Sequence, residues 1–228
     1  MTTFTDERFM ALALTLGQRG SGNVWPNPAV GCILVRNGRI VGRGWTQPGG
    51  TPHAEVVALQ QAGKKAVGAT AYVTLEPCAH TGKTGPCVDA LVTAGIVRCV
   101  IATQDTDPRV AGKGADSLRL AGVEVSEGCL EMQAEAAHYG FFKRISCGSP
   151  RITLKLALSL DGRIATKTGE SQWITGLEAR RDVHVLRSCH DAVLVGGGTA
   201  RADDPALTVR GLGQTSQPVR IVASKNLD

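Results

Sequence analysis

The chain has 228 residues, a formal net charge of +5 and 43% hydrophobic residues, a composition typical of a globular protein that can bury a core. Aromatic residues make up only 4% of the chain, and the lysines and arginines are scattered, so we expect neither a base-stacking platform nor a nucleic-acid partner. The N-terminus does not resemble a signal peptide, and no apolar stretch has membrane-spanning length. Seven cysteines without a secretory signal favour a reducing compartment over a disulfide framework.

The first part of the chain predicts a layered α/β fold. A helix is expected over residues 6–16, followed by a hairpin of strands 29–35 and 40–45 around the turn signal Asn37-Gly38. Further helices are expected at 52–62, 87–94, 115–121 and 130–142, and further strands at 71–75, 97–102 and 123–126. This alternation predicts a sheet with helices on both faces.

A change in composition at residues 146–150 predicts a linker. Beyond it we expect strands at 152–159, 192–195 and 219–223, and a helix that a capping box at Thr175 and Glu178 opens and that runs to residue 188. The three glycines at 196–198 are expected to form a turn. We therefore predict two domains, residues 1–147 and 148–228.

Four residues between positions 53 and 87 carry candidate zinc chemistry: His53, Glu55, Cys78 and Cys87. A catalytic zinc site needs three protein ligands, an open position for water and a separate acid/base group near that water. His53, Cys78 and Cys87 supply the ligands, and Glu55 supplies the catalytic carboxylate. The order His-x-Glu, Pro-Cys and a second cysteine is the signature of zinc-dependent nucleobase deaminases.

Other interpretations of these residues stay open. A structural zinc site would normally be closed by a fourth ligand, and His80 is near enough in sequence to be one. A deaminase of nucleosides or tRNA, and a non-catalytic zinc-binding or scaffold protein, are the alternative functions. The remaining cysteines fit small buried hydrophobes; they are Cys32, Cys99, Cys129, Cys147 and Cys189.

Eight residues separate Cys78 from Cys87, whereas cytidine and tRNA deaminases use Cys-x-x-Cys. This insertion resembles the pyrimidine deaminase of the bifunctional riboflavin-biosynthesis deaminase–reductases. The strings PNPAVG at residues 26–31, HAEV at 53–56, VTLEPC at 73–78 and VAGKG at 110–114 carry the same resemblance.

The resemblance implies a cytidine-deaminase-like three-layer α/β/α domain that binds Zn²⁺. It also implies hydrolytic deamination of 2,5-diamino-6-(5-phosphoribosylamino)pyrimidin-4-one. The substrate contacts that it implies are Asn27, His80, Lys83 and Asp105. The chain departs from the family at residues 44–47, where a histidine is usual and this chain has Thr46. It departs again where the usual Asp-Pro-Asn-Pro is replaced by Asp105-Thr106-Asp107-Pro108.

The second part of the chain resembles the reductase half of the same enzymes, through KLALSLDGRIA at 155–165, GESQWIT at 169–175 and ADDPALTVR at 202–210. This implies the N-terminal part of a dihydrofolate-reductase-like α/β domain that uses NADPH. Substrate-facing positions would be Ser171, Arg187, Leu207 and Arg210. Cofactor-facing positions would be Ala157, Trp173, Thr199, Asp203 and Ser224. Since the family's reductase domain is much longer, we expect a truncated chain with a partial reductase domain and incomplete NADPH binding.

The expected partner is therefore a small phosphoribosylated pyrimidine, in a cytoplasmic protein without a nucleic-acid or membrane partner. A homo-oligomer is also considered, because an open sheet edge in a partial domain invites pairing with a second chain.

Overall fold

The computed structural model describes residues 2–81, 85–107, 111–213 and 216–225. The chain divides into two compact units, Met1–Arg151 and Ile152–Asp228. Within the described residues, no helix combines the length and the apolar character needed to cross a membrane.

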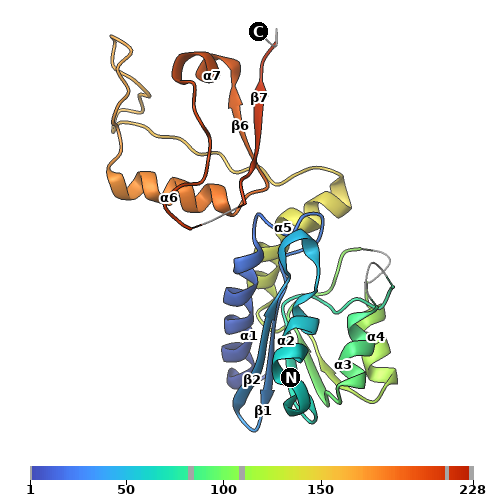
Figure 1. The fold of residues 1–228 in the computed structure, drawn as a ribbon. Coiled ribbons are helices and arrows are strands. Elements are labelled where there is room, and N and C mark those ends of the chain that lie inside the picture. Colours follow the sequence, from blue (N-terminus) through green and yellow to red (C-terminus); the bar gives the residue numbers. More distant parts are fainter. Residues whose placement is uncertain (1, 82–84, 108–110, 214–215, 226–228) are drawn as a thin grey trace. The chain divides into compact units, whose positions relative to one another are not determined.

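A five-stranded mixed sheet forms the centre of the first unit (Figure 1). Its strands are β1 Gly31–Arg36, β2 Arg39–Trp45, β3 Thr70–Val73, β4 Arg98–Ile101 and β5 Glu124–Ser126, in the order β2-β1-β3-β4-β5. Strand β1 runs antiparallel to β2 and β3, whereas β3, β4 and β5 run parallel. Because parallel strands end at the same edge of a sheet, the segments that follow β3 and β4 emerge next to each other.

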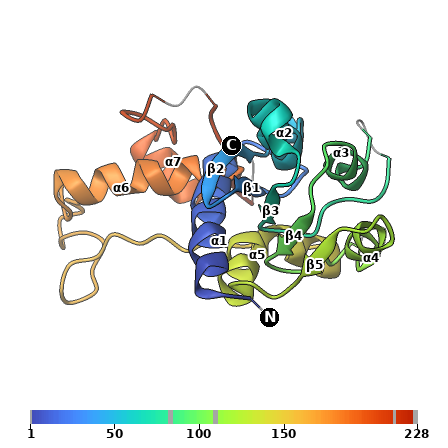
Figure 2. The ribbon, with the colours of Figure 1, turned by 90° about the horizontal axis from the view of Figure 1, so that it is seen from below.

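Helices cover both faces of this sheet (Figure 2). Helices α1 Phe4–Gly17 and α5 Glu131–Cys147 pack on one face, where Met10 and Ala134 meet Tyr72 and Val100. Helices α2 Ala54–Ala62, α3 Cys87–Thr93 and α4 Lys113–Leu120 pack on the other. Short 3-10 turns lie at Gln18–Gly20, Pro48–Gly50 and Gly63–Ala66. The predicted three-layer α/β/α arrangement is confirmed.

Helix α2 lies directly against the backbone of β2. A Cβ atom at Gly44 would lie 2.0 Å from the carbonyl oxygen of Ala54, and one at Gly42 would lie 2.3 Å from that of Ala58. Real Cβ atoms do not approach so closely, so glycine on β2 and alanine on α2 allow the two backbones to meet. This contact sets the distance between α2 and the sheet, and the first turn of α2 carries Glu55.

A buried ion pair anchors α1 to the sheet. Asp6 is 2% exposed and accepts hydrogen bonds from Arg98 on β4 at 2.7 Å and from the Tyr72 hydroxyl on β3 at 2.9 Å. The same carboxylate accepts from the backbone and hydroxyl of Thr3, which completes a capping box at the start of α1. The helix is therefore fixed both at its N-terminus and against two strands.

The structure differs from expectation at the end of the first unit. Helix α5 continues to Cys147, five residues past its expected end, and Gly148 terminates it with a left-handed φ of 63°. Cys32, Cys99 and Cys129 are buried as predicted, but Cys147 is exposed. Its place in the last turn of α5, at the edge of the unit, leaves no core for it to enter.

The second unit contains helices α6 Leu177–Ser188 and α7 Gly197–Asp203 and the parallel strands β6 Ala192–Gly196 and β7 Val219–Ala223. Helix α7 was not predicted, because three successive glycines disfavour a helix interior. The capping box was also wrong: α6 begins after Gly176, which has no side chain to cap it. Cys189 follows α6 directly and is exposed rather than buried.

The strand expected at residues 152–159 is absent from the described structure. The segment has alternating apolar residues, but Ile152 is 83% and Leu154 79% exposed. A strand needs a neighbour to pair its backbone groups, and β6 and β7 pair only with each other in the described part of this unit. Sequence alternation alone therefore could not establish a ladder here.

Candidate metal centre and pocket

Three side chains of the first unit converge on one point. The ligand atoms of His53, Cys78 and Cys87 all lie within 4.8 Å of one another. Nδ1 of His53 is 3.2 Å from Sγ of Cys87 and 3.7 Å from Sγ of Cys78. The described residues add no fourth ligand to this group, so His80 is not part of it.

These distances fit a tetrahedral zinc ion. With zinc–sulfur bonds of about 2.3 Å and zinc–nitrogen bonds of about 2.0 Å, a tetrahedral site separates nitrogen from sulfur by about 3.5 Å. The observed separations of 3.2 and 3.7 Å lie on either side of that value. One imidazole and two thiols are also the donor set of catalytic zinc sites that keep a fourth position open.

The local fold explains why residues far apart in sequence meet. His53 is the N-cap of α2, Cys87 is the first residue of α3, and Cys78 lies on the segment after β3. The backbone N–H of Cys87 donates to Sγ of Cys78 at 3.3 Å, and that of Val88 donates to the Cys78 carbonyl at 3.3 Å. The start of α3 is therefore tied to the segment that carries Cys78.

The two thiols are electrostatically unequal. Contact with the Cys87 thiol, followed by contact with His53, lowers the pKa of Cys78, and the same contact together with burial raises the pKa of Cys87. The hydrogen bond with Cys78 raises the pKa of His53. Such a cluster favours one thiolate and a nearby proton, which a divalent cation would displace.

Glu55 lies two residues from His53 in the first turn of α2 and is 4% exposed. Burial raises the pKa of its carboxyl group. A carboxyl with a raised pKa beside a metal centre suits a group that both accepts and returns a proton.

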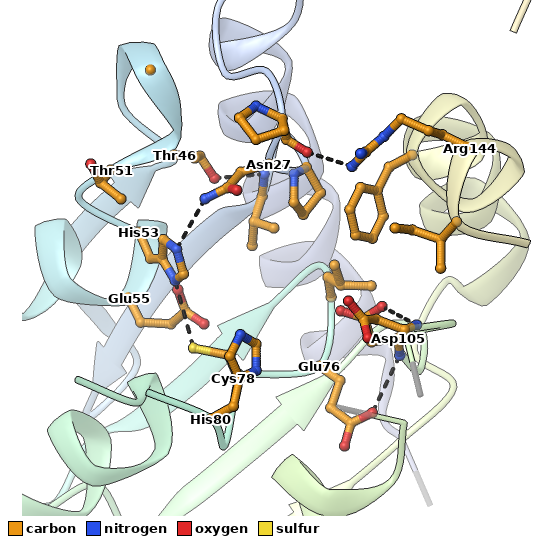
Figure 3. Close-up of a pocket in the computed structure, with 18 residues that line it drawn as sticks. Asn27, Thr46, Thr51, His53, Glu55, Glu76, Cys78, His80, Asp105 and Arg144 are labelled. Carbon is orange, nitrogen blue, oxygen red and sulfur yellow. Dashed lines mark hydrogen bonds between the residues drawn. The ribbon is translucent and has the colours of Figure 1, made fainter. Parts of the chain in front are cut away.

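A pocket of about 370 Å³ opens over this cluster (Figure 3). His53, Glu55 and Cys78 lie on one side of the pocket, and Arg144 of α5 lies on another. Phe141 and Ile145 of the same helix also line the pocket. Three of the four substrate contacts predicted for the deaminase part, Asn27, His80 and Asp105, line it as well. Lys83, the fourth, lies outside the described residues.

The contacts of these three residues differ. Asn27 Nδ2 donates to the Gly50 carbonyl at 2.7 Å and lies 3.3 Å from Nε2 of His53. Nδ1 of His80 is buried and has no hydrogen-bond partner among the described residues. Asp105 is 9% exposed, and burial raises the pKa of its carboxyl group to about 6. All three can therefore offer hydrogen-bonding groups to a polar ligand.

Thr46 occupies the region where the family usually has a histidine. It lines the pocket, is 2% exposed, and its hydroxyl accepts from the backbone N–H of Val30 at 3.0 Å. This side chain therefore also supports the backbone after Asn27.

Sequence reasoning missed several residues of the pocket wall, among them the charged residues Glu76, Asp107 and Arg144. In the sequence, Glu76 appeared only as part of the VTLEPC string that ends at Cys78. The only signal for Asp107 was that it stands where the family usually has asparagine. Arg144 donates to the Pro26 carbonyl at 2.6 Å and its guanidinium lies over the Phe141 ring. Its position at the pocket depends on α5 crossing the sheet, which no local pattern encodes.

The second unit brings some of its predicted residues together and leaves others apart. Arg187 donates to the Thr208 carbonyl at 3.1 Å, next to the buried Leu207, and burial followed by the charge of Arg210 lowers the pKa of Arg187. Ser224, which follows β7, packs against Gly197 at the start of α7. Helix α7 carries Thr199 and Asp203. Ser171, Ala157 and Trp173 lie on a stretch without helix or strand.

Comparison with known proteins relates both parts of the chain to described families. Residues 3–103 match the cytidine and deoxycytidylate deaminase zinc-binding region, and residues 150–228 match the RibD C-terminal domain. The riboflavin biosynthesis protein RibD of Escherichia coli is 53% identical over 97% of this chain, and that of Aquifex aeolicus is 50% identical over 98%. The chain spans 60% and 63% of the lengths of these two relatives.

Solved structures give the same result. A diaminohydroxyphosphoribosylaminopyrimidine deaminase/5-amino-6-(5-phosphoribosylamino)uracil reductase from Thermotoga maritima superposes with a TM-score of 0.90 at 43% identity, over 96% of this chain and 62% of that one. A RibD structure from Acinetobacter baumannii gives 0.88 at 47% identity, over 96% and 63%.

Proposed function

Because the chain belongs to the RibD family of riboflavin biosynthesis proteins, we propose that its first unit removes an amino group from 2,5-diamino-6-(5-phosphoribosylamino)pyrimidin-4-one by hydrolysis. The observation that carries this proposal is the meeting of His53, Cys78 and Cys87 beside the buried carboxyl of Glu55 in one pocket. The reaction releases ammonia and leaves the corresponding uracil derivative.

His53, Cys78 and Cys87 would hold zinc, and Glu55 would be the catalytic acid/base. A zinc ion held here would supply Lewis acidity that lowers the pKa of a water molecule towards neutrality. Glu55 takes one proton from the attacking water and gives it to a ring nitrogen, while the water oxygen bonds to the ring carbon that carries the amino group. Glu55 then takes the remaining proton from that oxygen and gives it to the amino group, so that the carbon–nitrogen bond breaks, ammonia leaves and the carbonyl of the uracil product forms. Its raised pKa suits a group that must pass through both protonation states in one turnover.

The other pocket residues would bind and orient the substrate. Asn27 and His80 offer hydrogen-bonding groups close to the metal ligands, and Asp105 offers a carboxyl group to the hydroxyls of the ribosyl part. Lys83 is proposed as a phosphate contact by family resemblance. Arg144 is a second cation at the pocket wall that an anionic substrate could meet.

For the second unit we propose the first part of an NADPH-dependent reductase domain, which in whole-length relatives would reduce the ribosyl group of the deaminated product. Thr199, Asp203 and Ser224 fit a shared cofactor-facing corner around α7, since Ser224 packs against Gly197 at its start. Ala157 and Trp173 would belong to the same surface. Ser171, Arg187, Leu207 and Arg210 would face the substrate, with the two arginines as phosphate ligands.

Domain limits, partners and location complete the proposal. We place the deaminase domain at residues 1–147 and the partial reductase domain at 148–228. The partner is a small phosphorylated pyrimidine rather than nucleic acid or membrane, and a homo-oligomer is proposed. A reducing cytoplasm is proposed because both thiols must stay available to metal.

The test is ammonia release from the phosphoribosylated diaminopyrimidinone, with cytidine as the comparison substrate. We expect turnover of the first substrate and a loss of about 10²–10⁴-fold in kcat in Glu55→Gln, with zinc content unchanged. Glu131→Gln, which removes an exposed acidic residue from the first turn of α5, is the matched control. Turnover of cytidine instead would assign the chain to the nucleoside deaminases. Zinc binding without turnover of either substrate would favour a structural site.

A further inference from the structure

The carboxylate of Glu76 is buried and fully engaged by backbone amides. Glu76 is 3% exposed. Its Oε1 accepts from Gly114 at 2.8 Å and from Ala115 at 3.1 Å, and its Oε2 accepts from Gly112 at 3.0 Å and from Asp105 at 3.2 Å. Three of these four N–H donors lie at the start of α4, and the fourth, that of Asp105, lies on the segment after β4.

These hydrogen bonds join three segments that are distant in sequence. Glu76 itself lies two residues before Cys78, and its backbone N–H donates to the Thr103 carbonyl at 3.0 Å. One set of partners therefore lies on the segment after β4, and the other lies at the start of α4. The metal-ligand segment is thereby attached to both.

The loop before α4 is shaped to reach this carboxylate. Gly112 adopts a φ of 79°, which a residue with a side chain rarely adopts. A Cβ at Gly114 would lie 2.1 Å from the Pro77 carbonyl oxygen and 3.1 Å from Oε1 of Glu76. The Gly112-Lys113-Gly114 string thus has a local reason, since only glycine lets the loop backbone rest on residues 76 and 77.

The carboxylate of Glu76 also fixes Asp105 and Asp107, which together form an acidic wall of the pocket. The backbone N–H of Asp105 donates to Glu76, and Oδ1 of Asp105 in turn accepts from the backbone N–H of Asp107 at 2.8 Å. Asp105 and Asp107 are 9% and 6% exposed, and both line the pocket. The position of this wall relative to Cys78 therefore depends on Glu76.

We propose that Glu76 is a positioning residue that sets substrate affinity by holding the Asp105–Asp107 wall at a fixed place beside the metal ligands. It acts through the backbone and does not touch the reacting atoms. This inference rests on the proposed function, because it takes the pocket to be the substrate site. It assigns to Glu76 a role in binding the part of the substrate that lies against the acidic wall.

Substitutions at this position separate charge from shape. Glutamine keeps one acceptor oxygen but turns an NH₂ group toward two backbone N–H donors, so Glu76→Gln should release part of the loop. Aspartate keeps the charge on a shorter chain and should restore part of the effect. Asp116→Asn is the matched control, because Asp116 is an exposed acidic residue in the first turn of α4, the helix whose first amides bind Glu76.

We would measure KM, kcat, zinc content and amide exchange on the full chain. In Glu76→Gln we expect KM to rise by about tenfold or more and kcat to change by no more than about threefold. Zinc should stay at one per chain, and the amides of Gly112, Gly114 and Ala115 should exchange faster. Glu76→Asp should lie between this variant and the wild type, and Asp116→Asn should match the wild type.

The inference is overturned if KM and the amide exchange stay at wild-type values, or if zinc is lost while the loaded fraction keeps the wild-type KM. If Glu76→Gln does not fold, the same measurements on Glu76→Asp decide between these outcomes. If the wild type releases no ammonia at all, the proposed function fails. Unchanged amide exchange in the variants would then still overturn the attachment of the wall to Glu76.

Discussion

Protonation of a histidine under the sheet should weaken the first unit at mildly acidic pH. His138 on α5 is 2% exposed, and its Nε2 lies 3.2 Å from the carbonyl oxygen of Thr74. Nδ1 is buried without a hydrogen-bond partner among the described residues, so a second proton would be a buried charge facing no acceptor. Burial lowers the pKa of His138 to about 4.

The sign and size follow from this pKa. Between its ordinary pKa of 6.5 and about 4, the folded chain binds fewer protons at His138 than the unfolded chain. Stability from the neutral ring is therefore complete above pH 6.5 and is lost as pH falls, by about 2.5 kcal/mol at pH 4.5. His138→Gln keeps an N–H donor for Thr74 but does not titrate, so its stability should lack this loss.

The assay is urea unfolding of both proteins at pH 7.5 and 4.5, with hydrogen exchange of the β3 and β4 amides as the report on the first unit. Between pH 7.5 and pH 4.5, the unfolding free energy of His138→Gln relative to that of the wild type should rise by about 2.5 kcal/mol. Tyr139→Phe, a substitution one residue along α5, should give a pH dependence parallel to that of the wild type. Parallel curves for wild type and His138→Gln would refute the reasoning.

The remaining predictions concern the metal centre and the anchor of α1. Cys87→Ser should reduce bound zinc to well below one per chain by elemental analysis, whereas Cys147→Ser should leave it unchanged; equal zinc in both would contradict the ligand assignment. Asp6→Asn should lower the unfolding free energy by about 3 kcal/mol, because it leaves Arg98 without its buried partner. Although burial acts to raise it, the bond to Arg98 holds the pKa of Asp6 below its usual range, so this stability should be present above pH ~4 and lost below it. A gap between variant and wild type that does not change with pH would argue against the ion pair.

Local chemistry could be predicted from the sequence, and long-range support could not. The metal-site residues and Glu55 stand out because each belongs to a short motif whose residue types imply a reaction. The role of Glu76 depends on amides 29 to 39 residues further along the chain, which meet it only because β3 and β4 end side by side. No spacing rule indicates that contact.

The same distinction explains the errors in the second unit. Alternating apolar residues at 152–159 describe a face that could be covered, but pairing depends on a neighbouring strand. The capping box at Thr175 failed by a single residue, because the helix begins after Gly176. Both patterns were locally sound, and tertiary context decided otherwise.

The close contact between β2 and α2 has a consequence for anyone who screens substitutions by activity. Gly44 binds no ligand and offers no side chain, yet a methyl group there would push against Ala54, the residue between His53 and Glu55. An activity screen would therefore report a substitution at Gly44 in the same way as a substitution of His53 or Glu55. Only a measurement of the position of α2 could distinguish a displaced helix from a missing functional side chain.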